Sequence, residues 1–176
     1  MAKDLHVFIG TKGEVIKMAP VMQELQARNI DYNFINSGQH IVTTKQLIED
    51  FKLKQPDYIL DARNNDVSSL KQGLAAIIKN VSKSPFKKKE MFNGKKGLCL
   101  LIGDTNTTIQ GLVIAKLSGL QVGHIEAGER TYRLFEPFPE EIVRRVVNKY
   151  SNYLFPLSEN GYNNLIKERR KGKIFP

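Results

Sequence analysis

Two short, mainly apolar runs that each end in a carboxylate constrain the fold of this chain most. Residues 98–102 are followed by Gly103 and Asp104, and residues 121–125 are followed directly by Glu126. A short continuous apolar run beside glycine is typical of a strand buried on both faces, as in parallel sheets. Ligands of open parallel sheets bind outside the carboxyl ends of the strands. We therefore expect both acids at one edge of a sheet.

Strand and helix patterns alternate along the whole sequence. The expected strands cover residues 6–9, 32–35, 58–60, 98–102, 121–126 and 153–156. The expected helices cover residues 14–28, 42–51, 67–81, 106–117, 140–150 and 160–168. Repeated β-α units with buried strands predict an α/β fold with a doubly wound, Rossmann-like parallel sheet. The length fits one domain over residues 1–176, and residues 173–176 resemble the start of another strand.

The formal net charge of +9 is concentrated in two short segments. Residues 83–96 hold six lysines and one glutamate, and residues 167–173 hold five basic residues and one glutamate, which together account for the whole excess. Neither segment has aromatic residues spaced to stack nucleic-acid bases. We therefore expect solvated surface there and no nucleic-acid partner.

The numbers and positions of cysteine and histidine residues indicate the cellular compartment of the protein and whether it binds a metal ion. A single cysteine, Cys99, excludes an internal disulfide and fits a reducing compartment. The first residues lack the apolar segment of a secretory signal, and no apolar run approaches the roughly 20 residues that span a bilayer. We expect a cytoplasmic protein without membrane contact. The histidines, His6, His40 and His124, are scattered, so no metal site is expected, and His6 and His124 are interpreted as structural.

The turn after the first expected strand has features of an anion site. Gly10 and Gly13 lie at a strand-to-helix turn, where backbone N–H groups and the helix dipole favour an anion. The spacing matches neither a dinucleotide-binding nor a P-loop motif. Lys12 and Lys17 either add charge to this site or are ordinary surface cations. The sequence leaves both interpretations open.

Acids and arginines gather again between Glu126 and Arg145. Asp104 alone can be an acid at a strand-helix turn, and Glu140 alone can be a favourable residue at a helix start. Carboxylates held near one another can take different pKa values and divide acid and base roles. Together with Glu126, these residues indicate acid–base chemistry on a small polar substrate.

Five motifs in order resemble those of the UDP-N-acetylglucosamine 2-epimerase family. Residues 10–20 (GTKGEVIKMAP) resemble the family's G-T-R-P-E-x-I-K-M-x-P, and residues 37–40 (SGQH) resemble T-G-Q-H. Residues 103–105 and 123–128 are similar to G-D-T and G-H-V-E-A-G. Residues 137–144 resemble P-F-P-E-E-x-N-R. The motifs extend over the whole chain, so the match is specific.

The resemblance implies interconversion of UDP-GlcNAc and UDP-ManNAc, precursors of cell-surface polysaccharides, by elimination and re-addition of UDP without a cofactor. It also implies a two-domain fold of the glycosyltransferase-B kind. This chain would be its amino-terminal domain, a carboxy-terminal nucleotide-binding domain would lie outside it, and the full enzyme would be a homodimer. The catalytic acids would fall on Asp104, Glu126 and Glu140. The substrate-binding groups would fall on Lys12, Lys17, Gln39, His40 and Arg144.

The sequence departs from the family pattern at four positions and leaves two alternatives open. Lys12, Gly13, Glu129 and Val143 stand where the family has arginine, proline, an apolar residue and asparagine. One alternative is the hydrolysing relative, which releases free ManNAc. The other is a non-catalytic sugar-nucleotide binding or assembly module that pairs with a separate carboxy-terminal chain.

Overall fold

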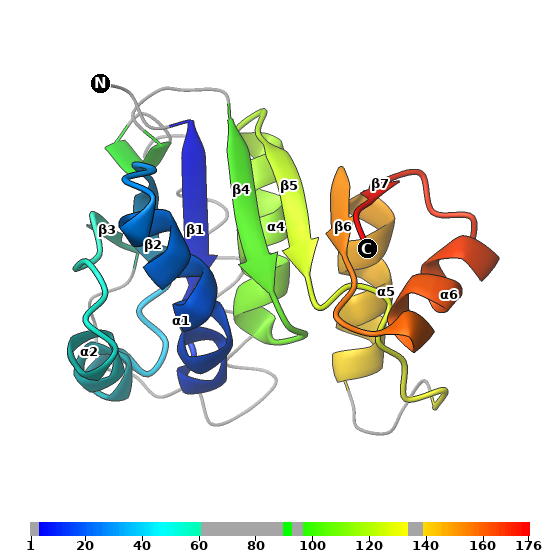
Figure 1. The fold of residues 1–176 in the computed structure, drawn as a ribbon, viewed down its shortest axis with the longest axis horizontal. Helices are drawn as coiled ribbons and strands as arrows, with labels where there is room; N and C mark the ends of the chain where they lie inside the picture. The colour runs from blue at the N-terminus through cyan, green and yellow to red at the C-terminus, as the bar shows by residue number, and fades with distance from the viewer. Residues whose placement is uncertain (1–3, 61–89, 93–96, 134–138) are drawn as a thin grey trace.

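Seven strands pair in parallel in the order β3-β2-β1-β4-β5-β6-β7 in the part of the chain that the structure describes (Figure 1). That part, in the computed structural model, comprises residues 4–60, 90–92, 97–133 and 139–176. The strands are β1 Leu5–Ile9, β2 Asn33–Asn36, β3 Tyr58–Ile59, β4 Leu98–Ile102, β5 Gln121–Ile125, β6 Tyr153–Phe155 and β7 Lys173–Ile174. The strand order reverses between β1 and β4, which is where open α/β sheets bind ligands.

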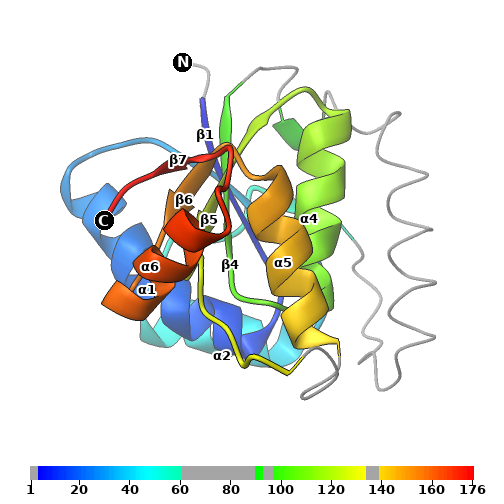
Figure 2. The same cartoon turned by 90° about the vertical axis from the view of Figure 1, so that its right-hand side faces the viewer.

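Helices cover both faces of the sheet (Figures 1 and 2). The helices are α1 Lys12–Ala27, α2 Ile41–Asp50, α4 Asn106–Leu117, α5 Glu140–Tyr150 and α6 Glu159–Lys167. In Figure 2, α1 and α6 lie on one side of the sheet, and α4 and α5 lie on the other. The expected doubly wound α/β fold is confirmed.

Alternating side chains of the central strands form two hydrophobic cores. Val7 and Ile9 of β1 pack on the α1 side, whereas Phe8 between them packs on the α4 side. The α1-side core also contains Val15, Met18, Met22, Phe34, Leu100 and Ile102. The α4-side core also contains Cys99, Leu101, Leu112, Val122 and Val147. Burial raises the pKa of the Cys99 thiol to about 12, so this cysteine is an inert core residue.

Every expected element that falls within the described residues is present, with ends shifted by at most two residues. The helices α4 and α5 match the expected bounds, and β7 confirms the strand start near the carboxy-terminal residues. Helix α1 begins at Lys12 and not at Glu14, because Thr11 caps it. The expected helix over residues 67–81 lies outside the described residues, as does most of the basic segment 83–96. None of the described helices is long and apolar enough to cross a membrane.

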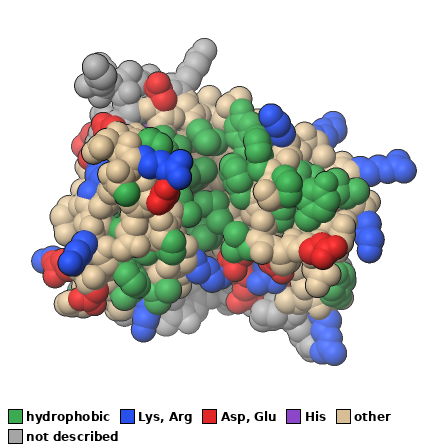
Figure 3. All heavy atoms as spheres, viewed as in Figure 1, with side chains coloured by type: hydrophobic (Ala, Val, Ile, Leu, Met, Phe, Trp, Pro, Cys, Tyr) green, Lys and Arg blue, Asp and Glu red, His purple; other side chains and the backbone are tan. Residues whose placement is uncertain are grey.

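Hydrophobic side chains gather on the face of the molecule that carries α1 and α6 (Figure 3). Figure 1 shows no described helix in front of β4 and β5 on this side. Leu5, Leu98 and Phe155 are only partly buried against the α1-side core. The Phe175 ring stacks on that of Phe155 at 5.4 Å between centroids and is 37% exposed. The described residues therefore leave an apolar strip over the middle of the sheet.

Candidate active site

The carboxyl ends of β1, β4 and β5 place three turns next to one another. These strands are neighbours in the sheet, and residues 10–14, 103–105 and 126–128 follow them in that order. The arrangement is the one that the apolar runs predict. Each of the three turns contributes a carboxylate, Glu14, Asp104 or Glu126.

Glu126 comes directly after β5 and forms an ion pair with Lys17 of α1. The Lys17 Nζ atom lies 2.7 Å from both carboxylate oxygens of Glu126. Glu126 has a φ of 69°, in the left-handed region that non-glycine residues rarely adopt and that recurs at functional sites. Lys17 is thus paired with a carboxylate at the end of β5, and its role at an anion site in the Gly10–Gly13 turn stays a prediction.

Asp104 lies beside Glu126 and forms an ion pair with Arg144 of α5. A Cβ atom built on Gly103, the residue before Asp104, would lie 3.8 Å from Glu126 Oε2. Gly103 itself has a φ of 79°, which a residue with a Cβ adopts only with strain. The side chains of Asp104 and Arg144 are 17% and 23% exposed, so the pair remains accessible at the edge of the sheet.

Glu140 begins α5 one helical turn before Arg144, on the same side of the helix. Its Oε2 atom is buried and has no hydrogen-bond partner among the described residues. A buried carboxylate oxygen without a donor is unusual in a folded protein. The structure thus brings Asp104, Glu126 and Glu140 to one edge of the sheet, together with Lys17 and Arg144.

The remaining predicted binding residues lie in two neighbouring turns. Gln39, after β2, accepts a 2.9 Å hydrogen bond from the Thr107 hydroxyl in the first turn of α4, which joins it to the same edge. His40 precedes α2 with a φ of 57° and does not cap that helix with its side chain. Lys12 is exposed at the first position of α1. Gln39 is therefore linked to the site through α4, whereas among the described residues no contact places His40 or Lys12 within it.

Glu14 is a buried polar residue whose position the sequence analysis did not foresee. Its Oε2 accepts hydrogen bonds from the backbone N–H groups of Gly10 (2.8 Å) and Thr11 (3.0 Å), and its Oε1 accepts one from the Thr105 hydroxyl (2.5 Å). Burial raises the pKa of Glu14, and these hydrogen bonds oppose that shift. The Thr-x-x-Glu spacing of residues 11–14 is a capping-box pattern and is the signal that predicts part of this arrangement.

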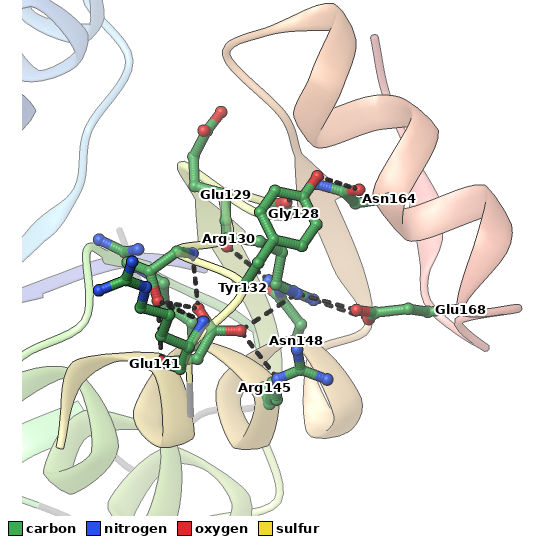
Figure 4. Close-up of polar contacts among 12 residues, drawn as sticks. Gly128, Glu129, Arg130, Tyr132, Glu141, Arg145, Asn148, Asn164 and Glu168 are labelled. Atoms are coloured by element: carbon green, nitrogen blue, oxygen red, sulfur yellow. Dashed lines mark hydrogen bonds and ion pairs between the residues drawn. The ribbon is translucent and has the colours of Figure 1, made fainter. Parts of the chain in front are cut away.

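A buried polar network lies behind the site, between the loop after β5 and the helices α5 and α6 (Figure 4). The Arg130 side chain, which is 1% exposed, donates to Glu168 from Nε (2.8 Å) and Nη2 (2.7 Å). Arg130 Nε also lies 3.8 Å from Oε1 of the fully buried Glu141. Partial burial opposes ionisation of Glu168, but hydrogen bonds and charge from Arg130 and Arg170 lower its pKa to about 2.

No group of three or more His, Cys, Asp or Glu side chains among the described residues is arranged to hold a metal ion. The groups that meet at this edge of the sheet are carboxylates beside cations. Carboxylates can remove or return protons, and the neighbouring cations can stabilise negative charge.

Residues 23–176 match the model of a protein family described as UDP-N-acetylglucosamine 2-epimerase. The chain belongs to this family. The UDP-N-acetylglucosamine 2-epimerase of Neisseria meningitidis is 39% identical over 168 residues, which cover 94% of this chain and 42% of that protein. The Campylobacter jejuni epimerase is 31% identical over 179 residues, covering 99% of this chain and 44% of that protein.

Solved structures of epimerases from this family share the fold. The structure of UDP-GlcNAc 2-epimerase from Neisseria meningitidis bound to UDP-GlcNAc superposes with a TM-score of 0.80 at 34% identity, covering 97% of this chain and 44% of that one. The Methanocaldococcus jannaschii epimerase in complex with UDP-GlcNAc and UDP gives a TM-score of 0.78 at 31% identity, covering 97% and 45%. The chain thus spans less than half the length of the epimerases that it matches.

Proposed function

We propose that this chain forms the amino-terminal part of a UDP-GlcNAc 2-epimerase, which interconverts UDP-GlcNAc and UDP-ManNAc. The observation that carries the proposal is the meeting of Asp104, Glu126 and Glu140 with Lys17 and Arg144 at one edge of the sheet, in a chain of the epimerase family. The relatives crystallised with UDP-GlcNAc support a UDP-sugar as the ligand.

The residue types at this edge suit an elimination and re-addition. A carboxylate removes the proton from C2 of the sugar, and the C1–O bond breaks so that its electron pair leaves with UDP. The products of this half-reaction are a 2-acetamidoglucal and UDP. Return of a proton to the opposite face of C2 and re-addition of UDP at C1 give the epimer. Asp104, Glu126 and Glu140 are the proposed acids and bases, and the step needs no cofactor because nothing is oxidised overall.

Cations and polar groups bind the substrate and balance the charge of the acids. Lys17 and Arg144, already paired with the acids, balance their charge and contact the substrate, while Lys12, Gln39 and His40 contribute further contacts. The diphosphate is held from the other side by a carboxy-terminal domain or a separate chain that supplies it. We further propose that the complete enzyme is a cytoplasmic homodimer.

Solvent deuterium exchange in the complete gene product tests this proposal. The protein is incubated with UDP-GlcNAc in heavy water, and the C2 proton and both epimers are followed by NMR. We expect deuterium at C2 and formation of UDP-ManNAc, and we expect Asp104→Asn, Glu126→Gln and Glu140→Gln to lower the rate by at least about 100-fold. Glu24→Gln is the matched control, because Glu24 forms an exposed pair with Arg28 within α1 and contacts no residue of the site.

The same sample distinguishes the alternatives. Accumulation of free ManNAc would identify a hydrolysing enzyme. UDP-GlcNAc binding without deuterium incorporation would identify a non-catalytic binding module, and the epimerase proposal would then be withdrawn.

A further inference from the structure

We infer that Glu14 and His124 are positioning residues that hold the turn carrying Asp104 from both sides. The inference rests on the proposed function, because the position of Asp104 affects a rate only if Asp104 reacts. Glu14 contacts the residue after Asp104, and His124 contacts the residue before it. Neither side chain touches Asp104 itself through a hydrogen bond.

On one side, Glu14 fixes Thr105. The Thr105 hydroxyl accepts from the N–H groups of Thr107 (3.1 Å) and Thr108 (3.3 Å) as the cap of α4, so its single proton is free to bind Glu14 Oε1. The other carboxylate oxygen of Glu14 is bound by the backbone at Gly10 and Thr11. Glu14, at 3% exposure, therefore ties the turn after β4 to the turn after β1.

On the other side, His124 fixes Gly103. The His124 Nε2 atom lies 2.8 Å from the Gly103 carbonyl oxygen, and Nδ1 lies 2.6 Å from the Asn148 side-chain amide. Burial lowers the pKa of His124, so the ring is neutral and carries one proton. Because a carbonyl can only accept, that proton is on Nε2, and Nδ1 accepts from Asn148.

The Asn148 amide is itself held in one orientation. With its Nδ2 donating to His124, its Oδ1 accepts from the backbone N–H of Gly128 at 3.1 Å and from Arg130 at 3.1 and 3.2 Å. Arg130 is anchored in turn by Glu168 (Figure 4). A chain of buried and partly buried hydrogen bonds thus connects the end of α6 to the carbonyl immediately before Asp104.

The two anchors should affect the position of the Asp104 carboxylate more than the binding of substrate. With both neighbours anchored, the Asp104 backbone has little freedom, and its carboxylate meets Arg144 and the accessible edge of the sheet. Misplacement of a reacting group by about 1 Å can lower a rate by about 100-fold. Loss of either anchor should therefore lower kcat and leave KM nearly unchanged, because the substrate contacts remain.

The first test uses the 176-residue chain and needs no activity. Backbone 15N relaxation is measured for residues 103–105 in the wild type and in His124→Leu, His124→Gln and His6→Leu. Glutamine retains an N–H that can reach the Gly103 carbonyl, whereas leucine does not. His6 is the matched control, since it is also a buried strand histidine, but its ring nitrogen contacts Asn33 and not this turn.

We expect the order parameter of the turn to fall from about 0.85 to below about 0.6 in His124→Leu only. An unchanged order parameter in His124→Leu, or an equal fall in His6→Leu, would overturn the inference. If His124→Leu does not fold, Glu14→Gln tests the other anchor, because one amide oxygen cannot serve both the backbone N–H groups and the Thr105 hydroxyl. That variant should loosen Thr105 in the same experiment, and a rigid turn would again contradict the inference.

The second test measures turnover in the complete gene product. We expect His124→Leu to lower kcat by about 100-fold with KM within about twofold, and His124→Gln to recover most of the loss. A rise in KM with unchanged kcat would overturn the positioning role. If the wild-type protein lacks epimerase activity while the relaxation results are as expected, the proposed function fails and the anchoring of the turn stands.

Discussion

At the scale of single residues, the charged pairs of this protein divide into accessible and buried ones. Lys17 and Glu126 are 47% and 23% exposed, whereas Arg130 and Glu141 are almost completely buried. An exposed ion pair contributes about 0–1 kcal/mol to stability, but removal of one partner of a buried pair costs about 3–5 kcal/mol. The first pair is therefore suited to chemistry, and the second to holding the loop after β5 in place.

This difference predicts that Lys17→Met lowers activity but has little effect on stability. We expect the free energy of unfolding to change by less than about 1 kcal/mol, because the Lys17–Glu126 pair is accessible. Turnover in the complete gene product should fall, because Glu126 loses its cation. Urea denaturation and the deuterium exchange assay measure the two effects. Arg28→Met, which breaks an exposed pair with Glu24 in the same helix, should alter neither quantity by a comparable amount.

Glu168 should make the stability of the chain depend on pH in the acid range. Its folded-state pKa of about 2 lies below the ordinary value of 4.5, so the folded state binds fewer protons than the unfolded state between these values. The stabilisation is complete above about pH 4.5 and is lost as the pH falls toward 2. Because the Glu168 carboxylate is partly accessible to solvent, which weakens its ion pairs, Glu168→Gln should lower stability at pH 7 by about 1–2 kcal/mol and flatten the profile between pH 4.5 and 2. The measurement is the midpoint of urea unfolding at several pH values across this range, with Glu24→Gln as the control. If the pH dependence of Glu168→Gln matched that of the wild type, as we expect for Glu24→Gln, the prediction would be contradicted.

At the scale of elements, the starts of α1 and α4 are coupled through Glu14. Thr11 and Thr105 each cap a helix with the side chain, but of these two hydroxyls only that of Thr105 also donates to the buried Glu14 carboxylate. Thr11→Ala should therefore cost about 1 kcal/mol, the usual value for a lost cap. Thr105→Ala should cost about 1–3 kcal/mol more, because a buried carboxylate loses a donor. Equal losses by urea denaturation would show that Glu14 does not depend on Thr105.

The elements were predictable because each depends on a local pattern. The capping residues Thr105–Thr108 mark the start of α4, and the apolar runs mark β4 and β5. The convergence of Asp104 and Glu126 followed from a general property of parallel sheets. The contact between Arg130 and Glu168 was not predictable, because the two residues are 38 positions apart and neither spacing nor composition reports such a pairing. The same holds for Glu14 and Thr105, whose contact depends on the order of β1 and β4 in the sheet.

At the scale of the whole molecule, the proposed site lies at one edge of the sheet, where the neighbouring strands β1, β4 and β5 end. The acids and Lys17 lie at the ends of β1, β4 and β5, and the matched epimerases are more than twice the length of this chain. The apolar strip over β4 and β5 is also only partly covered (Figure 3). Both observations support the proposal that a carboxy-terminal domain or a separate chain completes the site.

We therefore predict that the 176-residue chain alone turns over UDP-GlcNAc negligibly. Elimination and re-addition require that UDP stay bound while the C1–O bond is broken, which needs groups on both sides of the diphosphate and exclusion of water. This chain offers the carboxylates, Lys17 and Arg144, whereas under the proposed function the groups on the other side of the diphosphate belong to a carboxy-terminal domain or a separate chain. Loss of the positioning that those groups supply can alone account for roughly 7–11 kcal/mol of the barrier. The purified chain and the complete gene product are compared in heavy water by the loss of the C2 proton signal. Both samples contain the same carboxylates. Rapid deuterium incorporation by the isolated chain would contradict the prediction, because it would mean that this edge of the sheet is sufficient for proton transfer.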